Sequence, residues 1–133
     1  RLCKADLLSG VVGEFPEPME KKAFLDHLRK VFRAGGIRYA DCGQDRIRRV
    51  AVCGGSGSFL IFKALRAGAD AFVTGDITYH KFFDGEGRML LADVGHFESE
   101  QFTPELIRDR LSDYFNNFAV LLSETVTNPV KYH

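Results

Sequence analysis

The chain has 133 residues, of which 45% are hydrophobic and 12 are Phe, so it can bury a core and corresponds to one domain or part of one. Its 18 basic and 18 acidic residues balance, which gives no indication of a nucleic-acid or membrane-surface partner. No stretch approaches the roughly 20 consecutive apolar residues of a membrane-spanning helix, so we expect no membrane partner.

The chain begins at Arg1 rather than Met, and residues 2–13 lack the layout of a signal peptide, so we expect a piece of a longer protein. Its three cysteines, Cys3, Cys42 and Cys53, form no CxxC or metal-finger spacing. A sparse, odd set of cysteines is typical of a reducing compartment, which predicts a cytoplasmic protein.

The first part of the chain divides at residue 18. Residues 1–18 carry Ser-Gly and Pro punctuation and are predicted to be an N-terminal segment or linker, with a short extended piece at Val11-Val12. Residues 19–34 repeat apolar side chains at helical spacing and are followed by Gly35-Gly36, which predicts a helix that ends at the glycines.

From residue 37 onward, strand-like and helix-like segments alternate. Strands are predicted at 37–40, 50–53, 70–74, 88–94 and 119–123, and helices at 59–68, 77–83 and 98–115. Pro104 fits a first helical turn, so the residues before it can form a separate short turn. The order β, β, α, β, α, β, α, β predicts an α/β fold with a mixed, largely parallel sheet and packed helices.

Three of the predicted strands end in turns that contain glycine. The strands at 50–53, 70–74 and 88–94 are followed by Gly54 to Ser58 (GGSGS), by Gly75-Asp76 and by Gly95-His96. The carboxyl ends of parallel strands meet at one edge of a sheet, which is where open α/β sheets bind ligands. We therefore expect these three turns to lie together.

His96 and Glu100 follow the last of these strands with a spacing of i and i+4. On a helix this spacing places the imidazole and the carboxylate on one face, and a divalent metal accepts both groups as ligands. The alternative is a structural histidine near a helix N-terminus with a solvent-facing glutamate.

Asp76 and His80 share the same i, i+4 spacing. This pair can bind a metal or act as a general base, or Asp76 can cap a short helix and orient His80. Asp93, inside the strand before Val94, is a candidate for a buried partner that orients a neighbouring imidazole through its second ring nitrogen.

The GGSGS turn, which consists of Gly54, Gly55, Ser56, Gly57 and Ser58, precedes a predicted helix. Free backbone N–H groups at a helix start favour an anion, so the turn is a candidate phosphate site. It is neither a GxGxxG fingerprint nor a Walker A loop, and the alternative interpretation is a helix cap or a tight turn.

Four segments, RVAVCGGSGSFL, VTGDITYH, DVGHFESE and TNPV, occur in this order along the chain. In sequence and spacing they resemble the Nif-three-like dinuclear metal centre proteins, which are also named GTP cyclohydrolase 1 type 2 homologs. The resemblance covers the chain from about Glu14 to His133.

The resemblance implies a Nif-three-like α/β fold around a dinuclear metal site, in proteins that often assemble as toroidal hexamers. The GHxxxE motif of the family falls on His96 and Glu100, which are thereby implied as metal ligands. The remaining ligands, a His-His pair and an Asp, belong to the N-terminal half of the family, and this chain contains no His-His pair. Residues 19–133 are therefore implied to be the C-terminal α/β part of the metal-centre domain, with half of the site.

The three strand-end turns and the resemblance together predict a metal-dependent, hydrolase-like protein. The resemblance further implies a reaction of the GTP cyclohydrolase type and two divalent ions in each complete site. The sequence does not distinguish Zn, Fe, Mn and Mg. His80 or Asp76 would move protons, and the GGSGS turn would hold the phosphate of a nucleotide. The alternative is a non-catalytic scaffold or regulatory protein with a structural metal, whose function is ring assembly.

Overall fold

The computed structural model of the chain describes residues 2–3 and 9–133. Among these residues six strands form one mixed sheet in the order β1-β2-β4-β5-β6-β3. The strands are β1 (Leu2–Cys3), β2 (Val11–Glu20), β3 (Arg38–Ala40), β4 (Arg46–Ser56), β5 (Ala71–Gly75) and β6 (Leu90–Asp93). The three central strands β4, β5 and β6 are parallel, and antiparallel strands flank them on both sides. The predicted α/β fold with a mixed sheet is confirmed.

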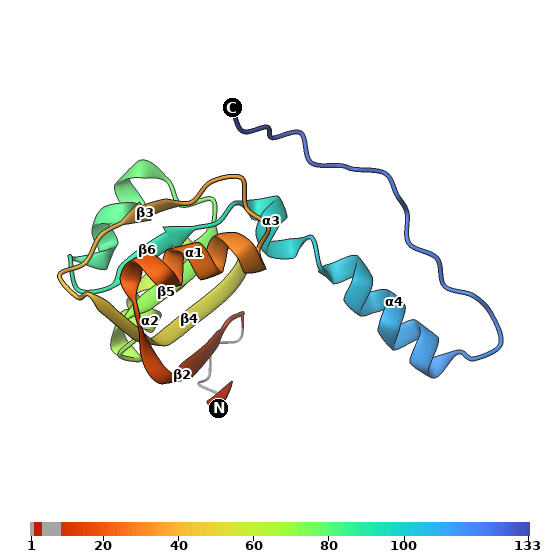
Figure 1. The fold of residues 1–133 in the computed structure, drawn as a ribbon, viewed down its shortest axis with the longest axis horizontal. Coiled ribbons are helices and arrows are strands. Elements are labelled where there is room, and N and C mark those ends of the chain that lie inside the picture. The colour runs from red at the N-terminus through yellow and green to blue at the C-terminus, as the bar shows by residue number, and fades with distance from the viewer. Residues whose placement is uncertain (1, 4–8) are drawn as a thin grey trace.

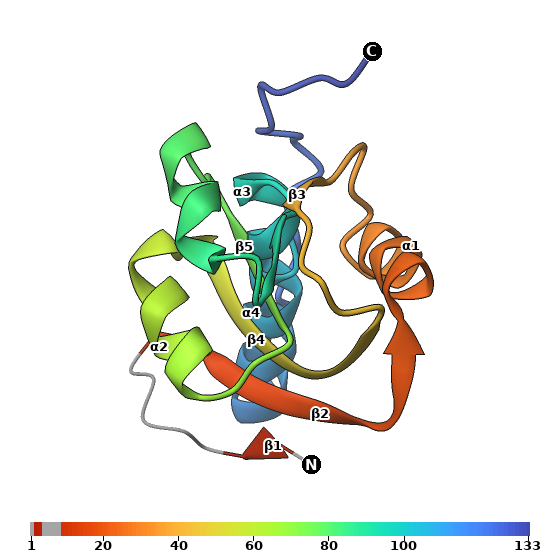
Figure 2. The ribbon, with the colours of Figure 1, turned by 90° about the vertical axis from the view of Figure 1, so that its left-hand side faces the viewer.

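Helices cover both faces of the sheet, as Figure 2 shows with α2 on one side and α1 on the other. The helices are α1 (Lys21–Val31), α2 (Ile61–Arg66), α3 (His96–Glu100) and α4 (Thr103–Tyr114), and 3₁₀ helices span Ser58–Leu60 and Tyr79–Gly85. The predicted helix at 59–68 is thus a 3₁₀ turn followed by α2, and the predicted helix at 77–83 is a 3₁₀ helix.

The central strands are apolar on both faces because each face meets a helical layer. On β5, Phe72 packs with the layer that contains α2, whereas Ala71 and Val73 pack with the layer that contains α1. On β6, Leu91 belongs to the first of these clusters and Leu90 to the second. The alternation of side chains along each strand therefore divides the core into two clusters.

The strand β2 corrects the prediction of a linker over residues 1–18. Of that segment, residues 1 and 4–8 lie outside the described residues, but residues 11–18 belong to a ten-residue strand that pairs with β4. The pairing is interrupted between Glu14 and Met19, where four residues oppose the single Arg48. Pro16 and Pro18, which suggested a loop, lie in this bulge, where a missing N–H costs no ladder hydrogen bond.

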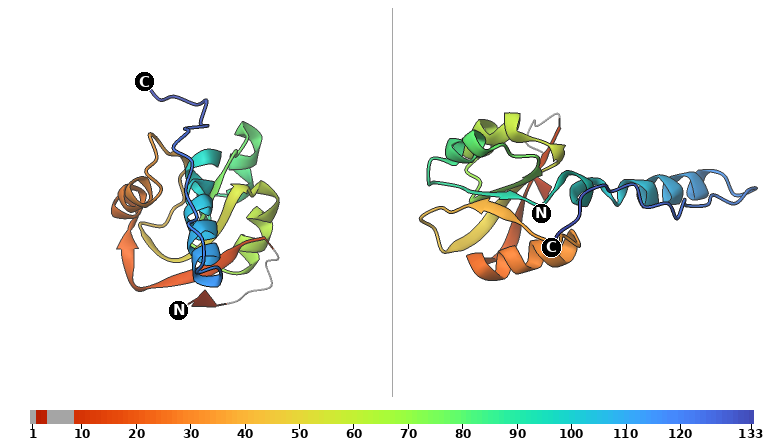
Figure 3. Two further views of the ribbon diagram at one scale, coloured as in Figure 1. Left: turned by 90° about the vertical axis from the view of Figure 1, so that its right-hand side faces the viewer. Right: turned by 90° about the horizontal axis from the view of Figure 1, so that it is seen from above.

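The C-terminal region departs most from the prediction. The helix predicted at 98–115 is two helices, α3 and α4, and the strand predicted at 119–123 is absent, since residues 119–133 have no regular structure. We call residues 103–133 the C-terminal arm. In Figure 1 α4 projects away from the sheet and the rest of the arm turns back toward the sheet, apart from α4 in that view although the two overlap in Figure 3. An extended apolar segment without a neighbouring strand edge has no ladder to join.

None of the helices in the described part of the chain combines the length and the apolar character that crossing a membrane requires.

Candidate metal centre

The three glycine-containing turns converge at one edge of the sheet, as expected from the parallel strands. The backbone N–H of Gly55 donates to Ser99 Oγ at 2.8 Å, which joins the end of β4 to α3. A Cβ atom at Gly75, the last residue of β5, would lie 2.9 Å from the Cα of His96. Only a glycine at position 75 therefore lets the start of α3 approach the end of β5 so closely.

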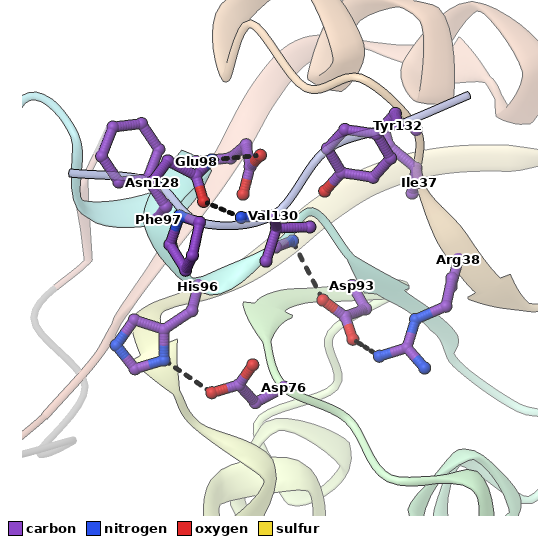
Figure 4. A pocket seen from close by; sticks show the side chains of 13 residues that line it. Ile37, Arg38, Asp76, Asp93, His96, Phe97, Glu98, Asn128, Val130 and Tyr132 are labelled. Atoms are coloured by element: carbon purple, nitrogen blue, oxygen red, sulfur yellow. Dashed lines mark hydrogen bonds and ion pairs between the residues drawn. The ribbon is translucent and has the colours of Figure 1, made fainter. Parts of the chain in front are cut away.

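His96 lies between two carboxylates, one on each side of its ring. Its Nδ1 is 2.6 Å from Asp76 Oδ2, and its Nε2 is 3.3 Å from Glu100 Oε2. Asp76 reaches the ring from the turn after β5 with a left-handed φ of 54°, a backbone conformation that few residues other than glycine adopt. The turn aims the Asp76 carboxylate at His96, as Figure 4 shows.

The two carboxylates change the titration of the imidazole. The hydrogen bond to Asp76 is the largest of the effects that raise the pKa of His96 above its ordinary value, and the negative charge of Glu100 adds to it. Partial burial of the ring acts in the opposite direction. A carboxylate on Nδ1 also fixes the orientation of the ring and, when Nδ1 carries the proton, leaves the lone pair on Nε2.

The His96–Glu100 pair fits two ligands of a divalent ion. The observed distance of 3.3 Å between Nε2 and Oε2 is close to the separation of roughly 3.3 Å between two ligands of a tetrahedral ion bound at about 2.0–2.1 Å. Asp76 lies on the opposite side of the ring and does not converge on the same point. Among the described residues no group of three or more His, Cys, Asp or Glu side chains could hold a metal ion. The chain thus offers a pair of ligands and a carboxylate that orients one of them.

Asp93 is buried, with an exposed fraction of 3%, and it acts on the backbone rather than on an imidazole. Its Oδ2 accepts from the Ile77 N–H at 2.9 Å and from the Arg38 guanidinium, and its Oδ1 accepts from the Gly95 N–H at 3.0 Å. The carboxylate therefore clamps the turns that carry Asp76 and His96, and the prediction that Asp93 orients an imidazole is wrong. Asp76 does so instead.

The predicted GGSGS turn is only partly a turn, because β4 extends beyond the predicted strand and includes Gly54, Gly55 and Ser56. Hydrogen bonds from within the protein hold this segment. The Gly55 N–H donates to Ser99 as described, and the Gly57 N–H donates to Thr74 Oγ1 at 2.9 Å. Thr74 Oγ1 in turn donates to the Gly55 carbonyl at 2.9 Å. Gly54 and Ser56 are exposed, and Ser58 is half-buried at the start of the short 3₁₀ helix. Two amides of the turn are thus already engaged, and phosphate binding at this turn stays a prediction.

Among the described residues His80 makes no hydrogen bond or ion pair with Asp76 or His96. It is exposed on the 3₁₀ helix Tyr79–Gly85, and its ring lies edge-on to Tyr79 at a centroid distance of 5.3 Å. The i, i+4 spacing pairs it with Asp76 in sequence, but the turn between them directs Asp76 to His96. A role for His80 in moving protons stays a prediction.

A cleft of about 690 Å³ adjoins the Asp76 side of His96. The end of the C-terminal arm forms one wall, because Asn128 Nδ2 lies 3.5 Å from Glu98 Oε1 and the Tyr132 ring covers Gly35. Burial and the neighbouring Glu98 carboxylate raise the pKa of the Tyr132 hydroxyl. The sequence predictions missed these wall residues, although the TNPV segment that contains Asn128 was one of the matching motifs.

The family profile for Duf34/NIF3 (NGG1p interacting factor 3) matches residues 2–129. The chain belongs to this family. Among curated relatives, a GTP cyclohydrolase 1 type 2 homolog of Staphylococcus epidermidis is 33% identical over 127 residues, which are 92% of this chain and 35% of that protein. A homolog of the same name from Campylobacter jejuni is 33% identical over 86% of this chain and 45% of its own length.

Solved structures of Duf34/NIF3 relatives share the fold. The crystal structure of Staphylococcus aureus protein SA1388 matches 93% of this chain and 42% of its own chain, with a TM-score of 0.85 at 30% identity. The protein ybgI, described as of unknown function, matches with a TM-score of 0.84 at 20% identity, which supports the fold alone. The chain spans less than half the length of the curated relatives it matches.

Proposed function

We propose that this chain contributes half of a dinuclear divalent-metal centre to a metal-dependent, hydrolase-like protein. The observation that carries the proposal is the arrangement at His96, with the Nε2–Glu100 Oε2 distance of a ligand pair and Asp76 on Nδ1. The remaining ligands would come from the part of a longer protein that this chain does not contain, as the family resemblance implies.

The residues of the chain would share the chemistry as follows. A bound divalent ion lowers the pKa of a coordinated water, so that it becomes a nucleophile near neutral pH. His96 and Glu100 would hold the ion, and Asp76 would keep the His96 ring in its ligating orientation. Asp76 or His80 would move protons, and the exposed position of both leaves them reachable by a substrate.

The name GTP cyclohydrolase 1 type 2 homolog belongs to the relatives, and it suggests ring opening of a nucleotide as the reaction. Membership of a fold family is weak support for one particular reaction, because function depends on the individual site. A nucleotide or another phosphate compound is therefore the first substrate to test. We also propose a homo-oligomer, a hexamer in the full-length protein, and a cytoplasmic location that agrees with the free thiols of Cys42 and Cys53.

The metal proposal is tested by comparing this chain with a longer protein that includes it. The 133-residue chain, which offers two ligands, should bind divalent metal weakly, and the longer protein should bind it tightly. Replacing His96 with Ala in the longer protein should abolish both metal binding and nucleotide turnover. Stoichiometric metal in the short chain, or turnover that survives His96→Ala, would contradict the proposal.

The second candidate is a scaffold or regulatory protein in which the metal is structural. The exposed apolar surface of the C-terminal arm favours it, since α4 has no buried residue and carries exposed Leu106, Ile107 and Leu111. Contiguous apolar surface of this kind marks a contact with another protein segment. In the longer protein, a readily exchanged ion with an open coordination position would favour catalysis, and a closed site would favour the scaffold.

A further inference from the structure

The cleft beside His96 has the dimensions of a small-molecule site. Its volume of about 690 Å³ falls within the range of ligand pockets, which is roughly 300–1,000 Å³. Ile37, Phe97 and Val130 supply apolar walls, and Asp76 and His96 lie at one side of the cleft in Figure 4. The pair of Asp93 and Arg38 lies at the other side.

The carboxylates of the cleft already have partners. Asp76 is bonded to His96, and Asp93 accepts from three donors including Arg38. Glu98 is buried, with an exposed fraction of 5%, and lies against Asn128 and Tyr132 of the arm. The negative charges that line the cleft are therefore paired or covered before any ligand enters.

Arg38 is a cationic group of the cleft with hydrogen-bonding capacity to spare. Both of its hydrogen bonds, to the Ile77 carbonyl at 3.1 Å and to Asp93, come from the single nitrogen Nη2. Within the described residues Nε and Nη1 have no hydrogen-bond partner, and 65% of the side chain is exposed. A guanidinium has five N–H donors in a planar fork, which matches a carboxylate or a phosphate.

The fork of Arg38 is also held in place. Asp93 and the Ile77 carbonyl fix one edge, and the guanidinium carbon lies 5.7 Å from the centre of the Phe82 ring, within the range of a cation–π contact. A side chain restrained in this way loses little conformational entropy when it binds an anion. An unrestrained surface arginine does not share this advantage.

From this arrangement we infer that the cleft binds the oxyanion of a small molecule with an apolar or aromatic body, and that Arg38 is the anchor for the oxyanion. The apolar body would lie between Ile37 and Val130, beside the Asp76–His96 pair. The inference deepens the proposed function, because it assigns the charged end of a substrate to a residue next to the metal ligands. It is tested on the chain without metal, so that the two proposals can fail separately.

The experiment is a titration of the isotope-labelled 133-residue chain, followed by amide chemical shifts, with phenyl phosphate, benzoate and uncharged phenol as probes. The backbone amides of Gly36, Gly95 and Asn128, which line the cleft, should shift with a dissociation constant on the order of 1 mM for one or both oxyanions. Phenol should bind at least about tenfold more weakly. The tighter of the two oxyanions identifies phosphate or carboxylate as the natural group.

Variants decide whether Arg38 is the anchor. Arg38→Gln should weaken oxyanion binding by about tenfold or more, and Arg38→Lys, which keeps the charge but loses the fork, should fall between Gln and the wild type. Arg88→Gln is the matched control, since Arg88 is equally exposed at 66%, pairs with Glu86 and lies away from the cleft. The affinity of the Arg88→Gln variant for the oxyanion probes should match that of the wild type.

Because Arg38 contacts the buried Asp93, the Gln variant can lose stability, and Val130→Glu provides an independent test. Val130 is 54% exposed on the arm, so Glu at this position should fold and should repel an oxyanion from the cleft. Unchanged oxyanion affinity in folded Arg38→Gln or in Val130→Glu would overturn the inference, as would the absence of shifts at the cleft amides with every probe.

Discussion

The sheet body, residues 11–94, and the C-terminal arm, residues 103–133, both carry many apolar residues, but they differ in how much of this apolar surface is buried. Every buried hydrophobic residue in the described part of the chain lies between Val12 and Val94. The arm has none, and Tyr114 and Leu121 are 82% and 87% exposed. Apolar periodicity therefore forms a core only where a second layer of secondary structure packs against it.

The largest effect is expected from truncating a core side chain of the body. Phe72 is 1% exposed on the central strand β5, so Phe72→Ala should reduce the free energy of unfolding by about 3–5 kcal/mol, measured by urea denaturation. Leu121→Ala in the arm is the control and should change it by no more than about 0.5 kcal/mol. A large cost at Leu121 would mean that the arm packs in solution and that the contrast is wrong.

A second test addresses the polar part of the body, where Asp93 joins β3, β6 and the turn after β5. Asp93→Asn keeps the shape of the side chain but points an NH₂ group at hydrogen-bond donors. The substitution should therefore reduce the free energy of unfolding by about 2–3 kcal/mol. Glu86→Gln removes an exposed ion pair with Arg88 and should cost no more than about 1 kcal/mol. If thermal or chemical unfolding gave equal losses of stability for Asp93→Asn and Glu86→Gln, the buried Asp93 carboxylate would contribute no more to stability than an exposed one.

A third test concerns the place where β4 approaches α3. Gly55 has a φ of 61°, and a Cβ atom there would lie 2.5 Å from Glu100 Oε1. Gly55→Ala should reduce the free energy of unfolding by about 1–2 kcal/mol through backbone strain, and it should also displace the Glu100 carboxylate. Gly68→Ala provides the control, because Gly68 has a similar φ of 68° with open space around it. If only Gly55→Ala shifts the NMR signals of Glu100, the close approach is real; identical spectra would contradict it.

The sequence predicted the body and its edge better than it predicted the arm or the contacts within the site. Apolar runs ended by glycines located β4, β5 and β6, and parallel pairing brought Gly55, Gly75 and His96 together. The partner of Asp76 could not be read from spacing, because its left-handed backbone turns the carboxylate across the strands to His96 rather than along the chain to His80. The prediction of a strand in the arm was wrong because residues 119–123 have a strand-like composition but no neighbouring strand in the described structure.

The smallest effect on stability, and the sharpest on the site, is expected from Asp76→Asn. The Asp76 hydrogen bond is the main cause of the raised pKa of His96, so the variant should lower that pKa toward the ordinary value of about 6.5, measured by NMR titration of the ring. Asp84→Asn, which removes a carboxylate paired with Lys81, should leave the titration of His96 unchanged.

The sign of the accompanying pH dependence follows from linkage. Since the pKa of His96 is higher in the folded chain than in the unfolded one, protonation stabilises the fold. This contribution is complete below a pH of about 6.5 and is lost as the pH rises through the raised folded value. Asp76→Asn should therefore destabilise the chain more in acid than in alkali. The loss should stay below about 1 kcal/mol, because 49% of the His96 side chain is exposed and solvent screens the pair. An equal loss below and above this pH range would instead show that the effect of Asp76 on stability does not depend on the charge of His96.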